Sequence, residues 1–110
     1  MTINDLPGLT EHIREFARVR DWEQFHTPKN LAMALSGEVG ELTALFQWLT
    51  PSESATAMAD DELAFNITDE VADVLIYLIR LADVLDIDLL RAAADKIDRN
   101  ETRFPAVREE

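Results

Sequence analysis

The chain has 110 residues, and its 22 acids against 10 lysines and arginines give a formal net charge of −12. Because nucleic acid polymers and anionic membranes are bound through basic surfaces, this charge argues against both as partners. The chain contains no cysteine, which excludes disulfides, thiolate metal sites and cysteine nucleophiles.

The length predicts one domain, residues 1–110, with a core at about 9–105 and a short tail at each end. The N-terminal sequence MTINDLPGLTEH has neither the basic start nor the apolar run of an export signal. No stretch approaches the ~18 uninterrupted apolar residues of a membrane span. We therefore expect a soluble cytoplasmic protein.

Apolar residues recur at helical spacing through most of the chain, which predicts an all-α fold of the four-helix-bundle type. Thr27 and Pro28 are typical of a helix start, and Asp88 is a suitable cap for another. The segment 51–62 is polar and small and is predicted to be a loop, and AVREE (106–110) a frayed tail. The predicted helices are Leu9 to Arg20, Pro28 to Leu49, Leu63 to Leu85, and about Asp88 to just before Pro105.

The third predicted helix is apolar on most of its circumference. Such a helix is buried on most of its circumference, which a monomer of this size does not easily achieve. We therefore expect a homo-oligomer with this helix near a subunit interface. The alternative is that it packs against three neighbours of its own chain. One stripe comprises Val71, Val74, Leu78, Leu81 and Leu85, and a second comprises Ala72, Leu75, Ile76 and Ile79.

Two pairs of acids lie three residues apart inside apolar helices, Glu38 with Glu41 and Glu70 with Asp73. Residues at this spacing share a helix face, so facing helices would bring four carboxylates together. Oxygen ligands of this kind suit Mg²⁺, or Mn²⁺. The alternative is that each pair forms a solvated, salt-bridged edge, but no Lys or Arg occurs between residues 30 and 79.

A di-iron carboxylate bundle also places acids inside four helices, but it normally requires two Glu-x-x-His motifs. The chain has one, Glu23 to His26, and His12 has no Glu three residues before it. The pattern therefore favours a site built from oxygen ligands alone.

Lys96, Asn100 and Arg103 share one face of the last predicted helix. These donors could hold phosphate oxygens, although cations are also favoured at a helix C-terminus by the helix dipole. Both interpretations remain open from spacing alone.

Aromatic residues lie near the acids, and flat rings beside a metal site could stack on a nucleobase. Packing in the core is the simpler interpretation for Phe16 and Phe46. The candidates for stacking are Trp22, Trp48 and Tyr77.

Three segments together resemble the MazG-like nucleotide pyrophosphohydrolases, and most closely their dCTP pyrophosphatase branch. They are RDWEQFHTPKNLAMALSGEVGELTALFQW, DEVADVLIYLIRLAD and KIDRNETRFP. The resemblance implies an oligomeric helical bundle, a dimer or a tetramer built from dimers. It implies metal ligands at Glu38, Glu41, Glu70 and Asp73, base-binding aromatics at Trp22, Trp48 and Tyr77, triphosphate contacts at Lys96, Asn100 and Arg103, and further matches at His26 and Asn30.

Two positions depart from the family pattern. Gly37 stands where many relatives have a glutamate, which leaves the identity of the general base open between Glu38 and Glu41. Phe104 stands where relatives often have tyrosine, so a hydroxyl is absent there.

The resemblance implies Mg²⁺-dependent hydrolysis of a deoxynucleoside triphosphate, dCTP or a modified dCTP, to the monophosphate and pyrophosphate. The same chemistry on another base such as dUTP is an alternative. A catalytically silent helical interaction module is another.

Overall fold

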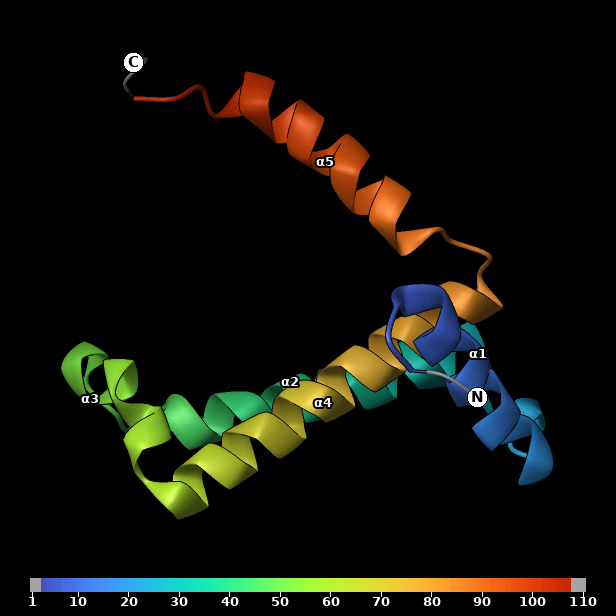
Figure 1. The fold of residues 1–110 in the computed structure, drawn as a ribbon, viewed down its shortest axis with the longest axis horizontal. Helices are drawn as coiled ribbons and strands as arrows, with labels where there is room; N and C mark the ends of the chain where they lie inside the picture. The colour runs from blue at the N-terminus through green and yellow to red at the C-terminus, as the bar shows by residue number, and fades with distance from the viewer. Residues whose placement is uncertain (1–2, 108–110) are drawn as a thin grey trace.

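The computed structural model describes residues 3–107, and among these it contains helices and no strand. The all-α prediction is confirmed (Figure 1). Residues 108–110 of the predicted C-terminal tail lie outside the described residues. The elements in chain order are α1 (Leu6–Val19), the 3-10 turn η1 (Glu23–Phe25), α2 (Pro28–Phe46), α3 (Pro51–Ala55), the 3-10 turn η2 (Ala57–Ala59), α4 (Asp61–Val84) and α5 (Leu89–Arg103).

The helix starts are set by side chains that accept hydrogen bonds from the first turn. Thr27 caps α2 and Asp88 caps α5, as predicted. The first helix begins at Leu6 rather than at the predicted Leu9, because the Asp5 carboxylate accepts a hydrogen bond from the Gly8 amide at 2.8 Å. The sequence NDLPG therefore forms a helix start and not a tail.

The predicted loop at 51–62 is wrong in part, since it contains the short helix α3 and the turn η2. A capping box starts α3: the Thr50 hydroxyl accepts from the Glu53 amide at 3.1 Å, and the Glu53 carboxylate accepts from the Thr50 amide at 2.9 Å. Pro51 fits the first turn of this helix. The preceding helix α2 correspondingly ends at Phe46, three residues before the predicted end.

The core is built around α2 and α4, which lie side by side and run in opposite directions (Figure 1). Leu31 on α2 and Ile79 on α4 are almost fully buried. α1 packs across the C-terminal part of α4, where Ala17 and Ala82 are buried. This arrangement holds the middle of α2 against the middle of α4.

α5 projects away from the other helices and buries none of its residues (Figure 1). The radius of gyration is 17.2 Å, against about 13 Å for a compact domain of this length. Leu90 and Ile97 on α5 and its C-cap residue Phe104 follow one another at intervals of seven, and all three are exposed. The chain therefore leaves an amphipathic helix without a packing partner of its own.

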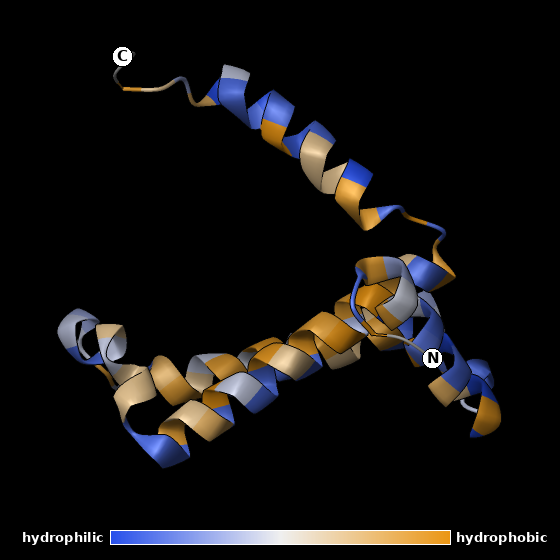
Figure 2. Cartoon of the chain, in the orientation of Figure 1, coloured by the Kyte–Doolittle hydropathy of each residue, from blue (hydrophilic) through white to orange (hydrophobic). Residues whose placement is uncertain are grey.

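Apolar residues recur along α4, as the orange bands of Figure 2 show, and several of them are exposed. Val71, Leu75 and Leu78 share one side of this helix and are exposed, while Ile67 and Ile79 are buried. One chain thus covers only part of the apolar circumference predicted for this helix. In the described part of the chain, no helix has the length and apolar character needed to cross a membrane.

Candidate metal and nucleotide site

The antiparallel pairing of α2 and α4 brings three of the four predicted metal-binding acids together. Glu38 lies in the middle of α2, and Glu70 and Asp73 lie one turn apart in the middle of α4. One carboxylate oxygen from each of the three lies within 4.8 Å of the other two. All three residues are half-buried. The three carboxylates are therefore close enough to bind one cation together.

The electrostatics of the cluster show that its charge is not balanced by protein groups. A hydrogen bond with the Glu38 carboxyl raises the pKa of Glu70 to about 7, with further contributions from burial and from the charges of Glu38, Asp73 and Glu41. Burial, followed by the charge of Glu38, raises the pKa of Asp73. Carboxylates that are held close together without a counter-charge retain protons.

One oxygen of the cluster is unsatisfied. Glu70 Oε2 has almost no exposed surface and no hydrogen-bond partner among residues 3–107. A buried acceptor without a donor is costly, and a hard cation would satisfy it. The donor set, the spacing and this oxygen therefore fit Mg²⁺ or Mn²⁺.

Glu41 lies one turn beyond Glu38 on the exposed part of α2, and its carboxylate is not among the three that cluster. Its charge nevertheless reaches Glu70 and contributes to the raised pKa. At Gly37, an added Cβ would meet no atom within 4 Å. Packing within this chain therefore leaves room for a side chain at this position.

Trp22 and His26 lie just before the N-terminus of α2, with their rings 6.2 Å apart and tilted by 59°. Asn30 braces the turn between them and α2, since its side-chain amide donates to the Phe25 carbonyl at 3.0 Å. Phe16, expected in the core, is instead exposed and packs edge-on against Trp22 at 5.7 Å. These contacts make the Trp22 and His26 segment an ordered unit.

Trp48 lies just beyond the opposite end of α2 and is 86% exposed. The 19 residues of α2 span about 28 Å. Trp22 and Trp48 of one chain are thus too far apart to stack on the same base. Tyr77 is half-buried on α4, one turn beyond Asp73.

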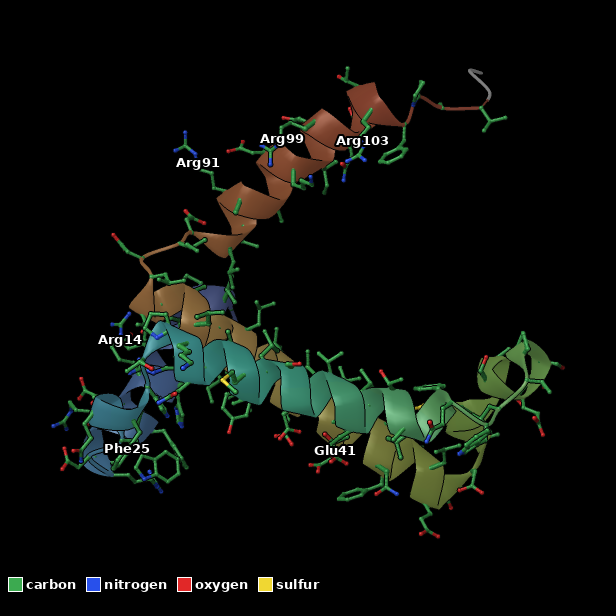
Figure 3. All side chains as sticks on the ribbon, turned by 180° about the vertical axis from the view of Figure 1, so that it is seen from behind. Arg14, Phe25, Glu41, Arg91, Arg99 and Arg103 are labelled. Carbon is green, nitrogen blue, oxygen red and sulfur yellow. The ribbon has the colours of Figure 1, made fainter. Side chains whose placement is uncertain are left out.

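The predicted phosphate-binding residues Lys96, Asn100 and Arg103 lie on α5, away from the carboxylates. Figure 3 labels Arg103 on this separate helix and Glu41 on the α2–α4 pair. The Arg103 guanidinium lies over its neighbour Phe104, 5.0 Å from the ring centre. One chain therefore assembles the acids but does not bring the predicted phosphate contacts to them.

Sequence reasoning missed a second charged group, formed by Arg14, His26, Arg80 and Asp83. Arg80 is 6% exposed and is the one buried polar residue found among residues 3–107. It donates to His26 Nδ1 at 3.0 Å and to Asp83 Oδ2 at 3.2 Å. The sequence contains a signal for this group, because Arg80 lies in an apolar run and is the one basic residue between Lys29 and Arg91.

A pocket of about 350 Å³ lies where α1, α4 and the start of α5 meet. It is lined largely by apolar residues, among them Leu6, Ile79 and Leu90, and by none of the clustered acids. The candidate metal site is therefore a surface between α2 and α4 and not this pocket.

Comparison with known proteins then identifies the family. A profile of the MazG-like family matches residues 33–110. The chain belongs to the MazG-like family. The family predicted from the three sequence segments is thus confirmed.

Curated proteins of mammals are similar to this chain over most of its length. dCTP pyrophosphatase 1 of Homo sapiens is 49% identical over 92 residues, which are 84% of this chain and 54% of that protein. The Rattus norvegicus protein of the same name is 48% identical over 91 residues, or 83% and 54%. The chain spans about half the length of these curated relatives.

The fold is shared with a solved structure. A pyrophosphatase from Archaeoglobus fulgidus superimposes with a TM-score of 0.86 at 36% identity. The match covers 96% of this chain and 97% of the archaeal one. The predicted MazG-like helical fold is therefore confirmed over nearly its whole length.

Proposed function

We propose that this MazG-like chain is a nucleotide pyrophosphohydrolase that depends on Mg²⁺, with Mn²⁺ as the alternative ion. Its proposed substrate is dCTP or a modified dCTP, which it converts to the monophosphate and pyrophosphate. The observation that carries the proposal is the half-buried cluster of Glu38, Glu70 and Asp73, in which the neighbouring acids raise the pKa of Glu70. The names of the mammalian relatives support the choice of dCTP.

In this proposal Glu38, Glu70 and Asp73 hold the metal, and Glu41 completes the acidic face. Bound Mg²⁺ would neutralise phosphate oxygens and lower the pKa of a water molecule. The Glu41 carboxylate lies outside the tight cluster and is exposed, so it is free to accept a proton from that water. No residue needs to form a covalent intermediate.

Substrate positioning is assigned to the remaining predicted residues. Trp22 and His26 form a base-binding unit at one end of α2, with Asn30 as its brace. Tyr77 lies on α4 beside the acids. Trp48 and the α5 donors lie away from the acids of their own chain. To bind the substrate, they must reach the acidic cluster of another chain. The α5 donors are Lys96, Asn100 and Arg103.

A homo-oligomer, a dimer or a tetramer, would resolve this separation. The uncovered stripe of α5 and the exposed apolar side of α4 are surfaces that a second copy can bury. Each chain could then contribute α5 or Trp48 to the site of its neighbour. Light scattering at micromolar protein should give at least a dimer, and a monomer mass would contradict the assembly.

The activity is tested by release of pyrophosphate from dCTP, dUTP, the other common dNTPs and 5-methyl-dCTP. We expect hydrolysis with Mg²⁺, none after chelation, and the highest kcat/KM for a cytosine nucleotide. Preference for dUTP would support the proposed reaction and contradict the proposed substrate. No Mg²⁺-dependent release from any dNTP would favour a silent helical interaction module.

A further inference from the structure

The His26 ring is held by one strong donor. The Arg80 Nε–H group donates a 3.0 Å hydrogen bond to His26 Nδ1. A guanidinium has donors and no acceptor, so the bonded nitrogen of the imidazole must be its unprotonated one. The neutral ring then carries its proton on Nε2.

The charges around the ring favour this neutral form. Burial and then the positive charge of Arg80 lower the pKa of His26, and the charge of Glu23 on η1 opposes them. A second proton would have to sit on Nδ1, facing the Arg80 guanidinium. The geometry therefore disfavours the imidazolium as well as the other neutral tautomer.

Arg80 is itself fixed in place. Its Nη1 atom donates to Asp83 Oδ2 at 3.2 Å, and Arg14 binds the same carboxylate through two hydrogen bonds of 2.7 and 2.8 Å. These bonds, chiefly that from Arg14, lower the pKa of Asp83 and keep it ionised. The chain of contacts runs from α1 through α4 to the ring that lies beside Trp22.

We propose that Arg80 is a positioning residue that holds His26 as a neutral Nε2–H donor for an acceptor atom on the nucleobase. This inference rests on the proposed function, because it places the base beside Trp22 and His26. A ring locked in this form offers one donor and no acceptor. It selects bases that present a carbonyl oxygen or an unprotonated ring nitrogen there.

The tautomer can be measured in the protein without substrate. The chain has two histidines, so a His12→Gln variant leaves the His26 ring as the one imidazole signal. Long-range ¹H–¹⁵N NMR near neutral pH should show an unprotonated Nδ1 and a protonated Nε2. A ring protonated on Nδ1, or on both nitrogens, would overturn the proposal.

The role in binding is tested with dCTP and with inorganic pyrophosphate, using Ca²⁺ to prevent turnover. Arg80→Met should weaken dCTP binding about two- to tenfold, the range of one neutral hydrogen bond, and leave pyrophosphate binding unchanged. Arg80→Gln retains a side-chain donor and should restore part of the dCTP affinity. The matched control is Arg18→Met, which removes an arginine paired with Glu15 on α1 and should change neither affinity.

A double-mutant cycle decides whether Arg80 acts through His26. In a His26→Phe background, Arg80→Met should have no further effect on dCTP binding. A full further loss, or equal weakening of pyrophosphate binding, would overturn the positioning role. If Arg80→Met fails to fold, Arg80→Gln replaces it in the cycle.

The two proposals fail in different ways. Absence of dCTP binding by the wild-type protein would overturn the proposed function and the role of His26 in binding a base. The NMR result does not depend on substrate, so it tests the tautomer of His26 whether or not dCTP binds.

Discussion

Helix α4 carries acids in two very different environments. Near its C-terminal end, the Asp83 carboxylate accepts hydrogen bonds from Arg14 and Arg80, which lower its pKa. In the middle of the same helix, Glu70 shares a hydrogen bond with another acid, and its pKa is raised to about 7. Burial does not account for the contrast, since the Asp83 side chain is only 16% exposed. The difference is whether the fold supplies a cation.

Asp83 is thus paired within the fold, whereas Glu70 lacks a positive partner from the described part of the protein. Where a carboxylate supports packing, this chain places arginines against it. Where the carboxylates converge between α2 and α4, the nearest charges are negative. We therefore propose a cation from solution as the partner of these carboxylates, which would also satisfy the unpartnered Glu70 oxygen.

The largest expected effect is on catalysis. Glu70→Gln keeps the size of the side chain and removes its charge, so dCTP hydrolysis should fall more than about 100-fold, beyond the loss expected for a residue that only supports a ligand. Asp69→Asn removes a neighbouring exposed charge from α4 and should retain activity. Full activity of Glu70→Gln at saturating Mg²⁺ would contradict the metal site.

The next effect is on the free energy of unfolding, and we expect neutralising Asp83 to lower it and neutralising Glu70 not to. Asp83→Asn leaves the buried Arg80 charge without its carboxylate and should lower the free energy of unfolding by about 3 kcal/mol. Glu70→Gln relieves repulsion and should leave metal-free stability unchanged or higher. Urea unfolding in chelator compares the two variants. Equal destabilisation by the two substitutions would show that Glu70 supports the fold as Asp83 does.

Mg²⁺ should stabilise the folded protein through the α2–α4 cluster alone. An ion that binds the native state adds about 2.7 kcal/mol when its free concentration is 100 times its dissociation constant. Thermal unfolding with and without Mg²⁺ measures this term. The gain should disappear in a Glu70→Gln, Asp73→Asn double variant, and an unchanged gain there would indicate general screening.

The smallest effect is the pH dependence of metal-free stability. The raised pKa of Glu70 means that the folded state holds a proton which the unfolded state releases near pH 4.5. This group therefore makes stability fall as pH rises from about 4.5 to about 7. The lowered pKa of Asp83 acts oppositely, with stability lost as pH falls below its unfolded value of 3.8. Urea unfolding of Glu70→Gln across pH should show a smaller first slope, because the raised pKa of Asp73 still contributes to it, and an unchanged second slope.

Much of the fold and the acidic cluster was predictable because their signals are local. Thr27 and Asp88 cap the helices that the sequence assigned to them, and spacing identified Glu38, Glu70 and Asp73 before any contact was known. The helical period places each acid on a face, and antiparallel packing then brings the faces together.

Other features depend on contacts that spacing does not encode. The polar segment after α2 forms a helix because Thr50 and Glu53 cap each other, which composition alone does not reveal. The position of α5 was not predictable, since its stripe at Leu90 and Ile97 indicates an apolar contact without identifying the partner. The pairing of Arg80 with His26 joins residues 54 positions apart.

The isolation of α5 also affects how well a single chain resists proteolysis. A helix of 15 residues is marginal in water when nothing packs against it. Its helical content should therefore fall on dilution, while the α2–α4 pair stays folded. The connection at Asp86 to Asp88 would then become the preferred point of proteolytic cleavage. Chains that find no copy would be removed first, so degradation would select for the assembled protein.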